Sequence, residues 1–190
     1  MAVHGFVLAG GRSSRMGQDK ALLRLDDRPL LQAVAQRMAE TCGGVTIIGP
    51  PDLYGSLGFE IVPDLQPGNG PLGGIEAALD LGRADLNVVV ACDMPNLTAD
   101  LLGRLVAAAR ETPADCVVAV SPGGRLEPLC AVYRTSCLPA VRRALAAGML
   151  RISRVLDELQ VVHYQLENQK EVVNLNTPQD WLTFRESERG

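Results

Sequence analysis

The stretch "NVVVACDMPN", residues 87–96, contains the most continuous run of β-branched residues in the chain and passes directly into an acidic turn. Such an apolar run is typical of a strand buried on both faces, as in the middle of a parallel sheet. The acid that follows, Asp93, stands where an unpaired carboxylate is costly to bury. We therefore expect Asp93 to hold a cation; an ordinary strand-end turn is the alternative.

On both sides of this run, apolar segments of strand length alternate with segments of helical periodicity. Further strands are predicted at residues 5–9, 45–48, 59–63, 115–121, 127–133, 161–164 and 172–175. Helices are predicted at residues 29–41, 71–81, 138–147 and 152–159, with two more behind the capping residues Thr98 and Thr177. This alternation predicts one α/β domain over residues 1–190, a three-layer α/β/α, Rossmann-like fold with a mostly parallel sheet.

The composition is that of a globular protein: 190 residues, 47% of them hydrophobic, with a formal net charge of −4. A chain of this length buries a sizeable core, and it lacks the basic excess that nucleic-acid binding normally requires. No apolar run approaches the roughly 20 residues of a membrane span, and the N-terminus does not resemble a secretion signal. We therefore expect neither nucleic acid nor a membrane among its partners.

The numbers of cysteines and histidines indicate which cellular compartment and which kind of metal ion to expect. The five cysteines are odd in number and form no CxxC pair, which argues against a disulfide framework. Free thiols in a reducing compartment are expected instead, and they predict a cytoplasmic protein. With two histidines in the whole chain, a zinc site is not indicated. A hard cation on oxygen ligands fits better, and Mg²⁺ is the first candidate.

Glycines, carboxylates and carboxamides follow four of the predicted strands. The segments are "GGRSSRMGQDK", "DLQPGNGPLGG", "DMPN" and "NTPQD". In open parallel sheets, ligands bind beyond the carboxyl ends of the strands. The sequence therefore predicts a ligand site at that edge of the sheet.

The first of these segments belongs to the glycine-rich stretch "LAGGRSSRMGQDK", residues 8–20. Its backbone N–H groups and the cations Arg12, Arg15 and Lys20 suit the oxygens of a phosphate. Gln18 stands where a Walker loop has lysine, and the glycine spacing is not GxGxxG, so neither a P-loop hydrolase nor a dinucleotide oxidoreductase is supported. A solvated turn with its cations in water remains the alternative.

The longer run "LAGGRSSRMGQDKALL" resembles the nucleotidyltransferase signature LAGGxSxRMGxDKxLL. It is most similar to the molybdenum cofactor guanylyltransferases, which join GMP to the phosphate of molybdopterin. The resemblance continues in order through "GPLGGIEAAL", "ACDMP", "EPLCAVY" and "NLNTPQD". It implies a fold of the nucleotide-diphospho-sugar transferase type, GTP as donor, molybdopterin or Mo-molybdopterin as acceptor, and Mg²⁺ as cofactor. Other proteins of cofactor biosynthesis, or acceptor proteins, are further candidate partners.

The resemblance also implies which residues bind the nucleotide. The members at the start of the loop, whose backbone would read guanine and ribose, are Leu8, Ala9, Gly10 and Gly11. Lys20 would hold the triphosphate, and Asp64 matches a nucleotide-binding aspartate of the family. Where the family pattern can have an asparagine, this chain has Gly49, which leaves one nucleotide contact without a residue.

For catalysis, the resemblance implies roles for Arg15, Lys20 and Asp93. Asp93 matches the magnesium-binding aspartate, so that it serves both metal and nucleotide, while Arg15 and Lys20 would stabilise the leaving pyrophosphate. Asn176 is our choice for a second metal ligand. Asn174 and Asn176 would share one face of the predicted strand 172–175 and its continuation, with turn or cap chemistry as the alternative.

The acceptor pocket carries the weakest signal. Glu127, at the start of "EPLCAVY", and Asn174 are the candidate acceptor-binding residues. Two rival functions stay open: a cytidylyltransferase, or another nucleotidyltransferase acting on a small phosphorylated acceptor, and a non-catalytic nucleotide-binding module. The LAGG form of the loop favours guanine by resemblance, and the joint presence of Arg15, Lys20 and Asp93 argues against a non-catalytic module.

Overall fold

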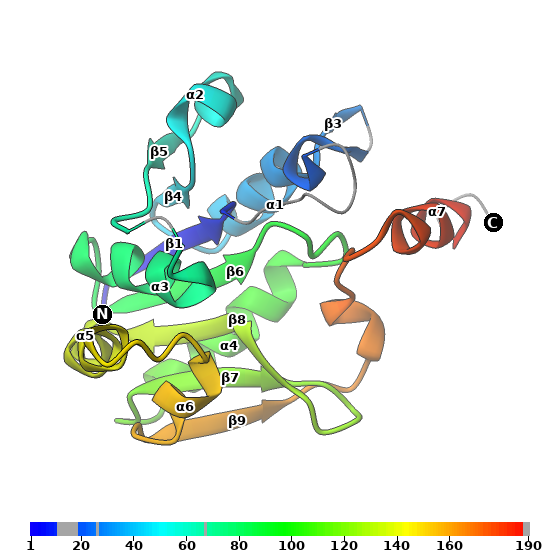
Figure 1. The fold of residues 1–190 in the computed structure, drawn as a ribbon. Coiled ribbons are helices and arrows are strands. Elements are labelled where there is room, and N and C mark those ends of the chain that lie inside the picture. The colour runs from blue at the N-terminus through cyan, green and yellow to red at the C-terminus, as the bar shows by residue number, and fades with distance from the viewer. Residues whose placement is uncertain (11–18, 26, 67, 188–190) are drawn as a thin grey trace.

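The sheet is built around β6 (Leu86–Ala91), the run of valines, which is buried at every position. The computed structural model describes residues 1–10, 19–25, 27–66 and 68–187. Its seven-stranded sheet has the order β5-β4-β1-β6-β8-β7-β9 (Figure 1). The other strands are β1 (Val3–Leu8), β4 (Val45–Ile48), β5 (Glu60–Val62), β7 (Cys116–Val120), β8 (Leu126–Arg134) and β9 (Val161–Gln165). Within this sheet β8 alone runs against its neighbours.

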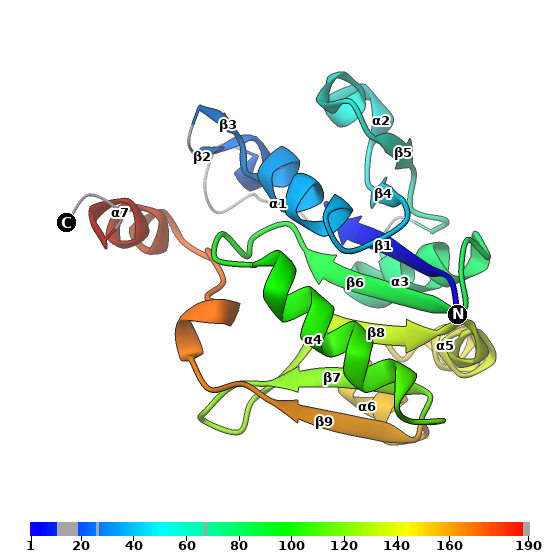
Figure 2. The same ribbon diagram turned by 180° about the vertical axis from the view of Figure 1, so that it is seen from behind.

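Helices cover both faces of the sheet (Figures 1 and 2). One face carries α1 (Leu30–Ala39) and α4 (Ala99–Arg110); the other carries α3 (Gly70–Asp80), α5 (Leu138–Ala146) and α6 (Ile152–Leu156). Because side chains alternate along a strand, β1 sends Val7 into the first core and both Phe6 and Leu8 into the second. The predicted three-layer fold with a mostly parallel sheet is confirmed.

The register of the parallel strands brings three strand ends to the same level. Leu8 of β1 lies opposite Ile48 of β4 and Ala91 of β6. The ladder continues one step further, since the Cys92 N–H donates to the Leu8 carbonyl at 3.2 Å. The residues that follow these strands therefore leave the sheet side by side.

The strand predicted at 172–175 is wrong. The chain there forms a short 3₁₀ helix, η4 (Gln169–Val172), and then an extended turn. Its buried apolar residues, Val172 and Leu175, are three positions apart, a spacing that suits a tight turn and not the two-residue period of a strand. The Asn174 amide also donates to the Val172 carbonyl at 3.1 Å, a local bond that competes with sheet pairing.

Several short elements lack a sequence prediction. They are η1 (Lys20–Leu22), the hairpin of β2 (Arg24–Leu25) and β3 (Arg28–Pro29), α2 (Pro51–Tyr54), η2 (Gly55–Leu57) and η3 (Thr135–Cys137). The last helix, α7 (Pro178–Ser187), begins as predicted: Thr177 Oγ1 accepts from the Asp180 N–H at 3.1 Å. The Asp180 carboxylate accepts in return from the Thr177 N–H at 2.7 Å. Among the described residues, no helix combines the length and apolar character needed to cross a membrane.

The cap of α4 gives a test of this local chemistry. Thr98 Oγ1 accepts from the Leu101 N–H at 3.1 Å, as the sequence predicts. Thr98→Ala should lower the free energy of unfolding, measured with urea, by about 1 kcal/mol because that N–H loses its partner. Thr98→Ser keeps the oxygen and should lose much less. Equal stability of the alanine variant and the parent chain would contradict the assigned cap.

Candidate active site

Lys20 lies within electrostatic reach of two carboxylates, Asp93 and Asp180, near the carboxyl end of β6. Asp93 follows β6, and its carbonyl accepts from the Leu175 N–H at 2.9 Å, which draws the segment before α7 to this edge. The Lys20 ammonium acts on both carboxylates and favours the ionised form of each. The backbone N–H groups of Asn176 and Thr177 are the main cause of the lowered pKa of Asp180, and Lys20 adds to them. The charge of Lys20 therefore acts on two acids at the predicted edge.

Asp93 has the character of a metal ligand. Its Oδ1 is buried and has no hydrogen-bond partner among the described residues. Burial raises the pKa of this carboxyl, and the Lys20 ammonium acts in the opposite direction. In the described ranges, no three His, Cys, Asp or Glu side chains are grouped as a metal cage. One free carboxylate oxygen with no cage fits Mg²⁺, which usually keeps several waters and shares its coordination with substrate phosphates.

Asn176 lies near Asp93 because the residue before it is hydrogen-bonded to the Asp93 backbone. The side chain of Asn176 is exposed to solvent. The Leu175 N–H donates to the Asp93 carbonyl, and the Asn176 N–H donates to Asp180 Oδ2 at 2.8 Å. The described contacts include none between the side chains of Asn176 and Asp93. The predicted shared face of a strand is therefore replaced by a turn in which these residues are held by backbone bonds.

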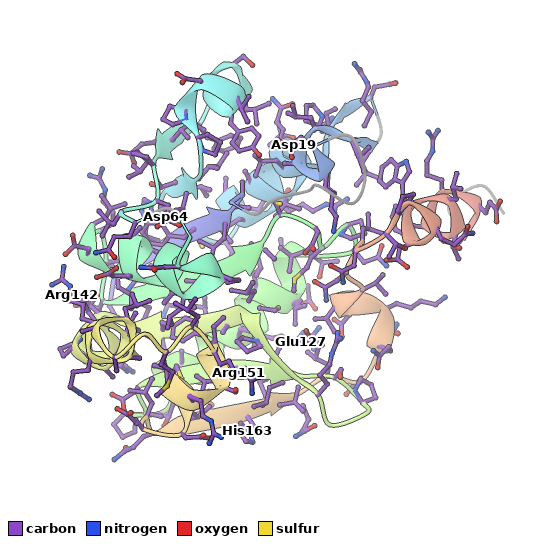
Figure 3. The ribbon with its side chains drawn as sticks, in the orientation of Figure 1. Asp19, Asp64, Glu127, Arg142, Arg151 and His163 are labelled. Atoms are coloured by element: carbon purple, nitrogen blue, oxygen red, sulfur yellow. The ribbon has the colours of Figure 1, made fainter. Side chains whose placement is uncertain are left out.

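Glu127 and Asn174 lie next to each other on the same side as Asp93. Glu127 is only 6% exposed and pairs with Arg125 at 2.7 Å. Burial is the main cause of the raised pKa of Glu127, the Arg125 and Asn174 side chains oppose it, and the negative charge of Asp93 adds to it. Figure 3 shows Glu127 at the lower part of the carboxyl edge. The two predicted acceptor residues are thus neighbours beside the strand that carries the candidate metal ligand.

Asp64 follows β5, beside the start of α3 (Figure 3). Its Oδ1 accepts from the Gln66 N–H at 3.2 Å. A Cβ at Gly73 would lie 3.1 Å from that same oxygen, and one at Gly74 would lie 3.0 Å from Leu8 Cδ1. Gly73 and Gly74 therefore let α3 pack closely on Asp64 and on β1.

At the end of β1, sheet pairing uses part of the backbone that was expected to read the nucleotide. The Leu8 carbonyl accepts from Cys92, and the Ala9 N–H donates to the Ile48 carbonyl at 2.8 Å. Gly10 is exposed, and a Cβ there would meet no described atom within 4 Å. Two other predicted site residues, Gly11 and Arg15, lie outside the described residues.

Gly49 leaves little space for the asparagine that the family pattern can carry. A Cβ at this position would lie 3.0 Å from the Tyr54 ring and 3.1 Å from the Ala9 carbonyl oxygen. Tyr54 in turn donates its hydroxyl to Asp19 Oδ2 at 2.7 Å. Sequence reasoning missed both Tyr54 and Asp19, because no short motif links a tyrosine in a four-residue helix to an acid 35 positions earlier.

Cys92 is not a nucleophile in this arrangement. Burial raises the pKa of its thiol to about 12, and the neighbouring Asp93 charge acts in the same direction. The thiol is protonated at neutral pH, and a thiol is a weak nucleophile in that form. Cys92 is therefore a structural residue at the end of β6.

Residues 5–163 match the model of the MobA-like NTP transferase domain. The chain belongs to this family. It is 38% identical to a probable molybdenum cofactor guanylyltransferase of Deinococcus radiodurans, over 92% of this chain and 89% of that protein. A protein of the same description from Pelotomaculum thermopropionicum is 35% identical, over 95% and 91% of the two chains. The family resemblance and the enzyme class, a nucleotidyltransferase, are therefore confirmed.

Solved structures agree with the fold. Molybdopterin-guanine dinucleotide biosynthesis protein A from Archaeoglobus fulgidus superposes with a TM-score of 0.85 at 26% identity and covers 98% of each chain. The 2-C-methyl-D-erythritol 4-phosphate cytidylyltransferase from Thermus thermophilus superposes with a TM-score of 0.73 at 17% identity, over 97% of this chain and 98% of that one. The second likeness concerns the fold alone.

The raised pKa of Asp93 predicts that this residue destabilises the metal-free fold at neutral pH. The Asp93 carboxyl binds its proton more tightly in the folded protein than in the unfolded chain, where its pKa has the ordinary value of 3.8. The stability that this group contributes is therefore lost as pH rises through the folded pKa. Asp93→Asn should therefore raise the free energy of unfolding at pH 7 in EDTA, measured with urea. The gain should shrink as pH falls through the raised pKa and vanish below 3.8.

The matched control is Asp157→Asn, since the Asp157 side chain is 67% exposed and its one described ion pair is with Arg154 at 3.7 Å. It should change stability by less than about 0.5 kcal/mol at any of these pH values. A loss of stability in Asp93→Asn at pH 7 would contradict an unpaired, desolvated carboxylate at this position.

Proposed function

We propose that the chain transfers GMP from GTP to the terminal phosphate of molybdopterin and releases pyrophosphate. An oxygen of the acceptor phosphate attacks the α-phosphorus of GTP in line, forming a new P–O–P bond as the bond between the α-phosphorus and its bridging oxygen breaks. The observation that carries the proposal is the buried Asp93 oxygen, which has no hydrogen-bond partner in the described part of the chain and lies within electrostatic reach of Lys20. The family membership and the names of the relatives support the choice of GTP and molybdopterin.

The nucleotide would lie across the ends of β1 and β6. Guanine and ribose would be read by the backbone from Leu8 to Gly11, with Asp64 as a further contact. Lys20 would hold the triphosphate, and Arg15 with Lys20 would stabilise the negative charge that develops on pyrophosphate. Such a transfer needs positioned reactants and neutralised charge and does not need a protein nucleophile, in agreement with the protonated Cys92.

Asp93, with Asn176 as the second candidate ligand, would hold Mg²⁺. When bound, the metal supplies positive charge to the phosphate oxygens of the reactants. The free Asp93 oxygen supports the first assignment, and the backbone proximity of Asn176 supports the second.

Glu127 and Asn174 would contact the acceptor. A carboxylate beside a carboxamide offers both hydrogen-bond acceptors and donors, which suits the mixed polar edge of a pterin ring. Their placement beside Asp93 supports this role, because the acceptor phosphate must reach the α-phosphorus. The free cysteines of the described chain support a reducing compartment, and we infer the cytoplasm.

The proposal predicts a defined nucleotide preference. In a screen of the four nucleoside triphosphates with molybdopterin and Mg²⁺, GTP should release pyrophosphate far faster than CTP, ATP or UTP. EDTA and Asp93→Ala should each abolish the reaction, because both remove the cation from the phosphates. Lys20→Ala should weaken GTP binding and lower the rate, through the loss of one charged contact.

Lys170→Ala is the matched control, because Lys170 is exposed in η4 and is the chain's other lysine. It should leave GTP turnover unchanged. A preference for CTP would replace the proposal by its cytidylyltransferase alternative. GTP binding without turnover of molybdopterin would point to another acceptor or to a non-catalytic module.

A further inference from the structure

Tyr54 connects the end of β4 to the residues just before Lys20. It is the last residue of α2, is only 3% exposed, and donates its hydroxyl to Asp19 Oδ2 at 2.7 Å. Burial and the Asp19 carboxylate both raise the pKa of Tyr54 well above its ordinary value, so the hydroxyl keeps the proton that it donates. Figure 3 shows Asp19 on the same side of the molecule as α2.

Both oxygens of the Asp19 carboxylate are engaged. While Oδ2 accepts from Tyr54, Oδ1 accepts from the Ala21 N–H at 3.0 Å and caps η1. The Asp19 carbonyl accepts from the Leu22 N–H at 3.1 Å. Lys20 is the first residue of this short helix: the bonds from Asp19 to Ala21 and Leu22 span it, and its own carbonyl accepts from the Leu23 N–H at 3.1 Å.

A glycine in the sequence leaves space for the Tyr54 ring. Gly49 lies under it, and a Cβ there would come within 3.0 Å of the ring and 3.1 Å of the Ala9 carbonyl oxygen. The ring therefore packs directly on the backbone at the ends of β4 and β1, both of which belong to the rigid sheet. Tyr54 and Asp19 therefore link the backbone at Lys20 to the ends of β4 and β1, where the candidate site lies.

We propose that Tyr54 is a positioning residue for phosphate binding: its hydroxyl fixes Asp19, and Asp19 fixes the backbone from which Lys20 reaches the triphosphate. This inference rests on the proposed function and adds a residue that no motif of the loop contains. A flexible lysine binds phosphate better when its backbone is already ordered, because less conformational entropy is lost on binding. Packing alone is the competing explanation of Tyr54, and it requires the ring and not the hydroxyl.

Tyr54→Phe separates the two explanations, since it keeps the ring and removes the hydroxyl. Its affinity for GTP, measured by calorimetric titration, should fall about tenfold, as expected for losing a hydrogen bond to a charged group. Its affinity for GMP, which lacks the β- and γ-phosphates, should change less than about twofold, because the effect acts on the triphosphate. In a Lys20→Ala background, Tyr54→Phe should cause no further loss of GTP affinity, because the effect passes through Lys20.

Tyr133→Phe is the matched control. The Tyr133 hydroxyl is also buried and donates to the Pro128 carbonyl at 2.8 Å, on β8. Removing it should lower the melting temperature by an amount similar to that in Tyr54→Phe while leaving GTP affinity unchanged.

Three results would overturn the inference while leaving the proposed function in place. They are unchanged GTP affinity in Tyr54→Phe, equal losses for GTP and GMP, and a loss that persists in the Lys20→Ala background. If the parent chain bound none of the four nucleoside triphosphates, the proposed function itself would fall, and the inference with it.

Discussion

The site depends on the parallel register that sets Leu8 of β1 opposite Ile48 of β4 and Ala91 of β6. Because these strands end at one level, Ala9, Gly49 and Cys92 follow them side by side, and Asp93 comes directly after Cys92. A slip of one residue would turn Val7 into the core now filled by Phe6 and Leu8, and it would also shift Ala9 and Gly10 relative to Asp93. The buried apolar faces therefore fix the geometry of the polar edge. In this sense the hydrophobic pattern of β1 and β6 determines where the phosphate chemistry can occur.

One group at the polar edge, the Asp93 carboxylate, lowers the stability of the metal-free fold at neutral pH. Asp93 is desolvated with a free oxygen, and the nearby Lys20 ammonium offsets its charge without pairing with it among the described contacts. Such an unsatisfied group is typical of a binding site, where the ligand supplies the missing partner. Around it the support is rigid: Asp180 is bound into the cap of α7, and Asp19 is bound by Tyr54. The candidate metal ligand Asp93 thus keeps one carboxylate oxygen without a described partner, while the carboxylates of Asp19 and Asp180 are held by hydrogen bonds.

Hydrophobic patterns in the sequence predict most of this architecture because they indicate which side chains are buried. The valine run of β6, the alternating strands and helices and the caps at Thr98 and Thr177 all follow from local periodicity and side-chain chemistry. The strand prediction at 172–175 fails because the adjacent valines Val172 and Val173 resemble the start of a strand, while the buried residues lie three apart and a local bond from Asn174 favours a turn. The Tyr54–Asp19 bond escapes prediction for another reason. It joins residues far apart in the chain, and a single sequence holds no signal for such a contact.

The most direct test of the account is the position of the metal relative to Asp93. A crystal of the chain grown with Mn²⁺ and a GTP analogue that cannot be cleaved between its α- and β-phosphates would locate the metal by anomalous scattering. If Asp93 is the metal ligand, an anomalous peak should lie about 2.1 Å from one of its carboxylate oxygens and in contact with the phosphates of the analogue. An ordered nucleotide with its metal elsewhere, and with Asp93 still unligated, would contradict it.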